Sequence, residues 1–121
     1  MSKKILVVDD EMHILRIVKY KLESAGYDVF TALNGVDALK IAREEKPALV
    51  FLDVMMPGMN GYEVCSHLKN DPNTNDIIVI MLTAKGQESD KIKGLEVGVD
   101  EYITKPFSPQ DLLDRTKDLL G

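Results

Sequence analysis

Apolar runs that read as strands alternate with stretches of helical periodicity along this chain. Ile5–Val8, Ala48–Leu52 and Ile77–Leu82 contain no polar residue, which is typical of strands that are covered on both faces of a parallel sheet. Tyr27–Ala32 mixes apolar and polar residues, as expected nearer a sheet edge, and Glu101–Thr104 is a short last strand. The pattern therefore predicts five strands.

Helices are predicted between these strands. They cover Met12 to Ser24, the segment from Asn34 to Lys46, Tyr62 to Lys69, about Glu88 to Val97, and the segment that follows Ser108. Ser108 and Pro109 have the form of a helix start, a serine cap followed by proline at the first helical position. Cys65 lies on the inner stripe of the third helix, which indicates a small core residue rather than a nucleophile.

This alternation predicts a doubly wound α/β fold with right-handed crossovers. The flavodoxin-like order of a five-stranded parallel sheet is 2-1-3-4-5, which places the first and third strands side by side. The carboxyl ends of all the strands then meet at one edge of the sheet. We expect that edge to carry Asp9, Asp10, Asp53, Thr83 and Lys105, which stand at the ends of the predicted strands.

Three carboxylates at one edge favour a bound cation. Asp9, Asp10 and Asp53 would repel one another, and each would raise the pKa of the next unless a positive ion lay between them. Mg²⁺ takes oxygen ligands and suits such a cluster better than zinc, which prefers His or Cys. The two histidines and the one cysteine stand apart from these acids.

Composition limits the classes of function that remain. A chain of 121 residues is expected to form one domain, residues 1–121. The net charge of −5 argues against direct nucleic-acid contact by this domain. One cysteine excludes an internal disulfide and suits a reducing cytoplasm, and no apolar stretch approaches the roughly 20 residues of a membrane span. We therefore expect a cytoplasmic domain without membrane contact.

Four motifs, taken together with their order, carry a family resemblance. They are Val8–Asp10, Leu52–Asp53 followed by Met-Pro-Gly, Leu82–Ala84, and Lys105–Phe107. With these motifs the chain resembles, along essentially its whole length, the receiver domain of bacterial two-component response regulators. The segments 83–86 and 105–109 are similar to receivers attached to winged-helix transcription factors, which implies a transcriptional output.

The resemblance implies a phosphoacceptor site. Asp53 would accept a phosphoryl group from a sensor histidine kinase. Asp10 would bind Mg²⁺ directly, Asp9 would contribute mainly through water, and the backbone carbonyl of Met55 would complete the metal shell. The domain would catalyse its own phosphorylation and dephosphorylation without being an enzyme in the ordinary sense, and it would control an output domain or a partner protein.

The resemblance also implies a switch. Thr83 and Lys105 would contact the phosphoryl oxygens, and Tyr102 would swing inward when the Thr83 hydroxyl moves toward the phosphoryl group. A cis bond is expected between Lys105 and Pro106. Met55 and Lys85 border the path by which water would approach Asp53. Neither side chain is suited to orient an attacking water, so we expect a comparatively long-lived phosphorylated state.

Phosphorylation is expected to drive a weak, symmetric homodimer through the fourth helix, the last strand and the last helix. Receivers of the winged-helix subfamily pair through this face, and its charges are self-complementary. Lys91 would pair with Asp111, Glu101 with Arg115, and Glu96 with Lys117 of the second copy. The apolar residues between these charges are Ile92, Leu95 and Leu113.

Two other classes of protein fit parts of the chain. A small Mg²⁺-dependent phosphohydrolase also uses an aspartate nucleophile, but it would need a cap domain and a second acid two residues after Asp53, where Met55 stands. A flavin-binding, flavodoxin-like module needs a phosphate-binding loop rich in Ser, Thr and Gly after the first strand. The acids from Asp9 to Glu11 would repel a phosphate there.

Overall fold

The computed structural model describes residues 2–84 and 91–121, with side chains from residue 94 onward in the second range. Strands and helices alternate in the order β1 (Lys4–Val8), α1 (Met12–Ser24), β2 (Asp28–Ala32), α2 (Gly35–Glu45), β3 (Leu49–Asp53), α3 (Gly61–Lys69), β4 (Ile78–Ala84), α4 (Lys91–Val97), β5 (Glu101–Lys105) and α5 (Pro109–Leu120). None of the helices in these ranges has the length and apolar character that a membrane span needs.

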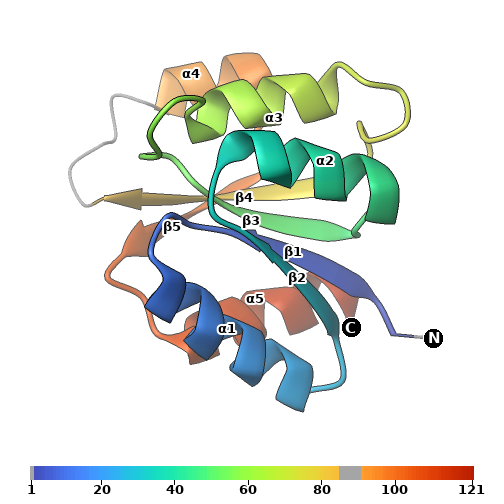
Figure 1. Cartoon of the computed structure of the whole chain (residues 1–121), viewed down its shortest axis with the longest axis vertical. Coiled ribbons are helices and arrows are strands. Elements are labelled where there is room, and N and C mark those ends of the chain that lie inside the picture. Colours follow the sequence, from blue (N-terminus) through green and yellow to red (C-terminus); the bar gives the residue numbers. More distant parts are fainter. Residues whose placement is uncertain (1, 85–90) are drawn as a thin grey trace.

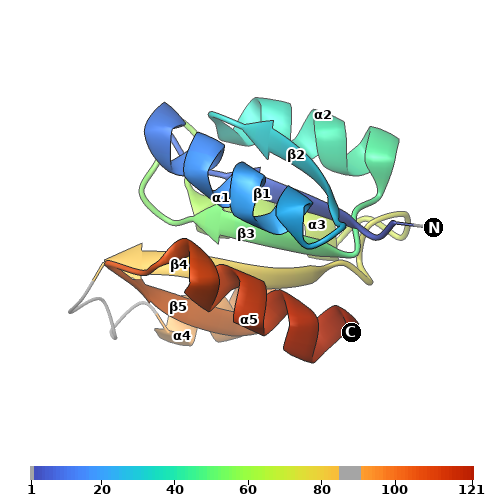
Figure 2. The same cartoon turned by 90° about the horizontal axis from the view of Figure 1, so that it is seen from below.

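The five strands form one parallel sheet in the order β2-β1-β3-β4-β5, as predicted. Helices α2, α3 and α4 cover one face of the sheet, and α1 and α5 cover the other (Figure 1). The view from below shows α1 and α5 lying across their face (Figure 2). All strands point the same way, so their carboxyl ends lie along one edge of the molecule, and the two termini lie toward the opposite edge.

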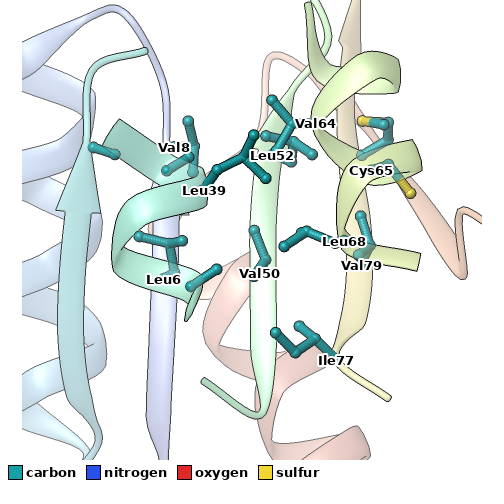
Figure 3. Close-up of a cluster of buried hydrophobic side chains, with 14 of the residues drawn as sticks. Leu6, Val8, Leu39, Val50, Leu52, Val64, Cys65, Leu68, Ile77 and Val79 are labelled. Atoms are coloured by element: carbon teal, nitrogen blue, oxygen red, sulfur yellow. The ribbon is translucent and has the colours of Figure 1, made fainter. Parts of the chain in front are cut away.

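The uninterrupted apolar runs are divided between two cores because alternate residues of a strand point to opposite faces. Val50 and Leu52 of β3 belong to the core under α2 and α3, whereas Leu49 and Phe51 belong to the core under α1 and α5. Figure 3 shows the first of these cores, in which Val50 and Leu52 meet side chains of α2 and α3. A strand covered on both faces needs no polar alternation, and β3 is fully buried.

Side-chain caps mark where α2, α3 and α5 begin. The side chain of Asn34 accepts a hydrogen bond from the Asp37 amide at the start of α2. Asn60 and Ser108 form capping boxes at the starts of α3 and α5, each with an acid at the third helical position. Because these caps satisfy amides that a first helical turn leaves unpaired, they place the helices on the sheet in a defined register.

The structure extends three predicted strands at their carboxyl ends, and β3 gains Asp53. β4 was expected to end at Leu82, but it continues through Thr83 to Ala84, because these two residues pair with Thr104 and Lys105 of β5. β5 correspondingly includes Lys105. The bond between Lys105 and Pro106 is cis, as predicted. The predicted start of the fourth helix near Glu88 lies outside the described residues.

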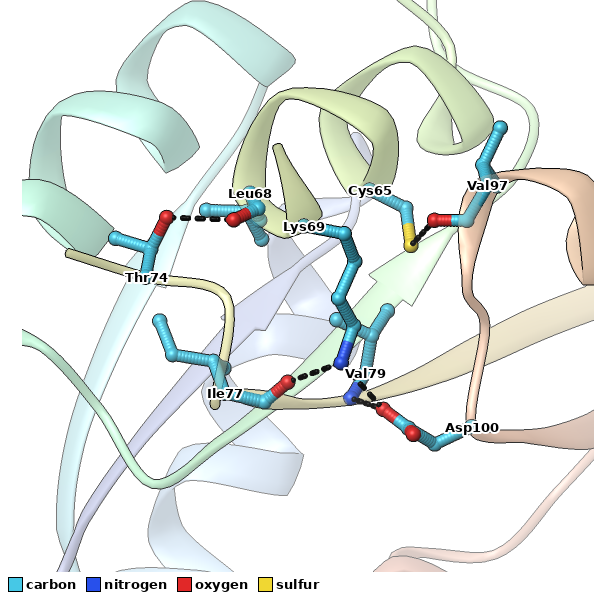
Figure 4. A network of polar contacts seen from close by, with 8 residues as sticks. All are labelled: Cys65, Leu68, Lys69, Thr74, Ile77, Val79, Val97 and Asp100. Carbon is cyan, nitrogen blue, oxygen red and sulfur yellow. Dashed lines mark hydrogen bonds and ion pairs between the residues drawn. The ribbon is translucent and has the colours of Figure 1, made fainter. Parts of the chain in front are cut away.

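A polar network ties α3 to the amino end of β4 and to the segment before β5 (Figure 4). The Lys69 ammonium donates to the Ile77 carbonyl at 2.7 Å and to the Asp100 carboxylate at 2.9 Å. The same carboxylate accepts the Val79 amide at 2.8 Å. Cys65 is fully buried beside this network, and burial raises the pKa of its thiol to about 11. The prediction of an inert core cysteine agrees with these surroundings.

Candidate functional site

The acids predicted to converge lie together at the carboxyl edge of the sheet. Asp9 and Asp10 follow β1, and Asp53 ends the neighbouring strand β3. Each of the three offers a carboxylate oxygen, and these oxygens lie within 4.8 Å of one another. Asp9 and Asp53 are buried, whereas Asp10 is exposed at the mouth of the cluster. The strand order alone brings these residues together, since 43 to 44 positions of sequence separate β1's acids from Asp53.

Lys105 provides a positive charge inside this cluster. Its ammonium nitrogen lies 3.1 Å from Oδ2 of Asp9 and 3.4 Å from Oδ2 of Asp53. Burial lowers the pKa of Lys105, but the hydrogen bond to Asp9 and the charges of Asp53 and Asp9 outweigh burial, and the net shift is upward. Lys105 therefore remains charged while it bridges two carboxylates from different strands.

Interactions of opposite sign act on the pKa of Asp53. Burial raises the pKa of its carboxyl group from 3.8 to about 6, with a further rise from Asp9. The charge of Lys105 and hydrogen bonds from the Met55 amide and Lys105 act in the opposite direction. The Lys105 ammonium thus compensates only part of the cost of burying several carboxylates, and further positive charge at this edge would favour the ionised form.

The two buried acids differ in the contacts that their oxygens already make. Asp9 accepts the Glu11 amide on Oδ1 at 3.0 Å and the Lys105 ammonium on Oδ2 at 3.1 Å. Asp53 accepts the Met55 amide on Oδ1 at 3.2 Å and faces Lys105 with Oδ2. Both oxygens of Asp9 are therefore engaged by protein donors, while Asp10 is open to solvent.

The donor set fits a hard divalent cation. The cluster offers carboxylate oxygens alone, which suit Mg²⁺ or Ca²⁺ and do not suit zinc or copper. The raised pKa of Asp53 is a second sign of an uncompensated negative site. The structure thus contains residues that could bind a metal ion at the position that the sequence predicted.

Thr83 lies on β4, the strand next to β3, and Tyr102 lies on β5, one strand further from the acids. Thr83 is buried one residue beyond Leu82, which is the register partner of Asp53. The Tyr102 hydroxyl is buried against α4, in the space that a Cβ atom at Gly94 would occupy. Among the described residues this hydroxyl has no hydrogen-bond partner. Tyr102 is thus held toward α4 rather than fully exposed.

The surface predicted to pair two copies differs from expectation at two residues. Leu113 is buried under α5 and packs against the sheet, because it shares the inward stripe of that helix with Leu112. Arg115 contacts Glu101 of its own chain and lies 3.1 Å from Asp118. The predicted members that are exposed are Leu95, Glu96, Asp111 and Lys117. The side chains of Lys91 and Ile92, and the whole of Lys85, lie outside the described residues.

The sequence patterns did not identify Gly61, a residue beside the site. Gly61 begins α3 and packs directly against the backbone of Asp53. The sequence offers only the Asn60-Gly61 pair ahead of a helix, which is also typical of an ordinary turn. A close approach between backbones leaves no hydrophobic periodicity, so only the structure identifies it.

Known proteins resemble this chain over nearly its full length. A family model described as the response regulator receiver domain matches residues 5–117. The alkaline phosphatase synthesis transcriptional regulatory protein PhoP of Bacillus subtilis is 52% identical over 120 residues, which are 99% of this chain and 49% of that protein.

Two solved structures are similar to this chain. The chemotaxis protein CheY4 of Vibrio cholerae aligns with a TM-score of 0.92 and 32% identity, over 99% of this chain and 100% of that chain. DrrB, an OmpR/PhoB homolog of Thermotoga maritima, aligns with a TM-score of 0.87 and 43% identity, over 99% of this chain and 53% of that chain.

The chain spans about half the length of the transcriptional regulators that it matches. The matches confirm the resemblance to receivers of transcriptional regulators that the motifs indicated. They give no support to the phosphohydrolase alternative.

Proposed function

The chain belongs to the response regulator receiver family, a family of phosphorylation-activated signalling switches, and from this membership we propose that Asp53 is its phosphoacceptor. The observation that carries the proposal is the meeting of Asp53 with two other acids and Lys105 at the carboxyl edge of the sheet. Asp53 is the acid that ends the central strand β3.

The proposed reaction is transfer from a phosphohistidine of a sensor kinase. An oxygen of the Asp53 carboxylate forms a bond to phosphorus as the P–N bond breaks and its electron pair stays on nitrogen. A proton on the other ring nitrogen of the phosphohistidine lets the imidazole leave as a neutral group, and the product is an aspartyl phosphate. Such a transfer depends on alignment and charge compensation more than on acid or base help. Lys105, whose ammonium lies 3.4 Å from Asp53, would compensate charge on the phosphoryl oxygens, and Thr83 would donate a hydrogen bond to them.

We propose that the acids hold Mg²⁺, which when bound would supply positive charge to the carboxylates and the phosphoryl oxygens. Asp10 and Asp53 would be direct ligands, together with the backbone carbonyl of Met55. Asp9 would act through water, a role supported by the two protein donors that already occupy its oxygens. With this arrangement the domain would promote its own phosphorylation and dephosphorylation.

A sensor histidine kinase is the proposed phosphoryl donor. A groove of about 420 Å³ lies beside Lys105, between α1 and the connection from β5 to α5. Its apolar lining includes Ile14, Ile17 and Phe107, and Ile17 is 53% exposed. An apolar surface next to the acceptor would allow the kinase to dock while it presents its phosphohistidine.

We propose a transcriptional output, since PhoP is a transcriptional regulatory protein by name and extends well beyond the matched part. The output domain or partner would contact DNA, because the net charge of −5 disfavours contact by this domain itself. Such an output places the protein in the cytoplasm. Phosphorylation would move Thr83 and Tyr102 and reshape α4, β5 and α5.

The same reshaping would promote a weak homodimer through these elements. Arg115 would have to exchange its contact with Glu101 of its own chain for one across the interface, so pairing would depend on a local rearrangement. Exposed ion pairs contribute only about 0 to 1 kcal/mol each. This small contribution agrees with a dimer that forms only when the switch is activated.

Chemical phosphorylation tests the proposed acceptor without the kinase. Phosphoramidate with Mg²⁺ should add one phosphoryl mass increment to the wild-type chain, and Asp53→Asn should abolish the increment. Asp28→Asn, which changes an exposed acid at the start of β2, should leave it intact. Asp10→Ala should weaken Mg²⁺ binding, whereas Lys105→Ala should spare it. Labelling of Asp53→Asn at the wild-type rate would contradict the proposal.

A further inference from the structure

We propose that Gly61 is a positioning residue for the acidic site, because its lack of a side chain lets α3 approach the end of β3 closely enough to fix the Asp53–Met55 backbone. The inference rests on the proposed function of that site. Gly61 is buried and is the first residue of α3. Its φ lies outside the left-handed region, so the backbone conformation itself does not require glycine.

The backbone of β3 leaves no space for a side chain at this position. A Cβ atom on Gly61 would lie 2.5 Å from the carbonyl oxygen of Asp53 and 3.0 Å from Cα of Val54. Both are backbone atoms, so neither can rotate away as the end of a flexible side chain could. The Gly61 amide also donates to the Val54 carbonyl at 3.0 Å, which closes the connection between β3 and α3.

The surrounding structure limits how an added methyl group could be accommodated. The Val54 amide donates to the Leu82 carbonyl of β4 at 3.2 Å, which holds one side of the contact on the sheet. The capping box of Asn60 and Glu63 holds the other side, at the first turn of α3. A side chain at position 61 would therefore displace the peptide between Asp53 and Val54 or separate α3 from the sheet.

Either displacement would reach the site. The Met55 amide donates to Oδ1 of Asp53 at 3.2 Å, and this hydrogen bond helps to orient the carboxylate. The Met55 carbonyl proposed as a metal ligand belongs to the same short segment. Groups that orient ligands from outside the metal shell typically change metal affinity by about 10- to 100-fold when they are altered.

Gly35 supplies a matched control within the chain. It too is the buried first residue of a helix, α2, behind an asparagine cap. A Cβ atom there would lie 2.8 Å from Cγ2 of Val64 and 3.0 Å from Cβ of Met59. These two atoms belong to side chains, and the third contact, at 3.2 Å, is the carbonyl oxygen of Met59 in the loop before α3. None of the three belongs to the Asp53–Met55 backbone. Gly35→Ala therefore crowds the helices without pressing on the acceptor strand.

The test is calorimetric titration of Mg²⁺ into the wild-type chain, Gly61→Ala and Gly35→Ala, at a temperature where melting curves show all three folded. Gly61→Ala should bind Mg²⁺ about 10- to 100-fold more weakly than wild type, and Gly35→Ala should bind as wild type does. In metal-free NMR spectra the Val54 and Met55 amide resonances should shift in Gly61→Ala and stay near their wild-type positions in Gly35→Ala.

A second pair of variants keeps the test decisive if Gly61→Ala does not fold. Asn60→Ala releases the start of α3, and Asn34→Ala releases the start of α2, because each removes a side chain that caps its helix. Asn60→Ala should weaken Mg²⁺ binding and Asn34→Ala should not.

Unchanged Mg²⁺ affinity in Gly61→Ala would overturn the role of Gly61. So would equal weakening in Gly61→Ala and Gly35→Ala or, where Gly61→Ala does not fold, an Asn60→Ala variant that binds Mg²⁺ as Asn34→Ala does. A wild-type chain that neither binds Mg²⁺ nor accepts a phosphoryl group would instead contradict the proposed function.

Discussion

Removal of the Asp53 charge should stabilise the metal-free protein at neutral pH. Burial and the neighbouring Asp9 raise the pKa of Asp53 from 3.8 to about 6. The difference of about two pKa units corresponds to roughly 3 kcal/mol at about 1.4 kcal/mol per unit. Because the folded pKa is raised, the folded state favours the protonated acid. The loss of folding stability caused by ionised Asp53 is absent below about pH 4. It grows between about pH 4 and about pH 6 and is constant at higher pH.

Urea unfolding of wild type and Asp53→Asn in the presence of a chelator measures this cost. At about pH 7.5 the variant should be more stable by roughly 3 kcal/mol, and at about pH 4 the gap should close. Lys105 keeps its contact with Asp9 in the variant, so no new unpaired charge is created. Asp28→Asn is the control, since Asp28 is exposed and should show no such gap.

Saturating Mg²⁺ should narrow the difference at neutral pH, because only the wild type retains the full set of acids that we propose to bind the ion. A variant no more stable than wild type at neutral pH would refute the electrostatic reasoning. A gap that does not change with pH would refute it equally, because the gain would then come from packing or solvation of the amide.

Three further predictions concern the switch and its lifetime. Met55→Asn should accelerate dephosphorylation because an amide can orient the attacking water, and loss of the phosphoryl label at or below the wild-type rate would count against this. Gly94→Ala should expel the Tyr102 hydroxyl from its place against α4, visible as a different Tyr102 rotamer in a crystal structure; an unchanged rotamer would be inconsistent with the packing described. Beryllofluoride should produce a dimer in sedimentation velocity that Arg115→Glu abolishes, and an activated chain that stays monomeric at high micromolar concentration would disprove the dimer.

Strand patterns predicted most of this fold because the physical signal is local. The apolar runs of β1, β3 and β4 can be buried only in a sheet covered on both faces, and the structure assigns alternate residues of β3 to two cores. The convergence of Asp9, Asp10 and Asp53 then follows from strand order. The point at which a strand stops pairing with its neighbour was harder to predict from the sequence. β4 continues to Ala84 because β5 supplies a partner for it.

Side-chain environments were the part that sequence patterns could not provide. Arg115 was expected to reach another copy, but Glu101 lies within reach on β5 of the same chain. Leu113 was expected at a surface, yet the inward stripe of α5 includes it. The contact of Gly61 with the Asp53 backbone has no sequence signature beyond a glycine at a helix start. The contacts of Arg115 and Gly61 depend on the distance between elements, whereas the burial of Leu113 follows from the periodicity of α5 itself.

Chemical identification of the phosphorylated residue would establish whether Asp53 is the acceptor. The wild-type chain would be treated with phosphoramidate and Mg²⁺, and borohydride would then reduce the acyl phosphate to homoserine before peptide mapping by mass spectrometry. If Asp53 is the acceptor, homoserine will be found at position 53, within the peptide that contains β3, and at no other acid. Homoserine at Asp9 or Asp10, or a stable phosphoryl group on a residue other than an acid, would contradict that assignment.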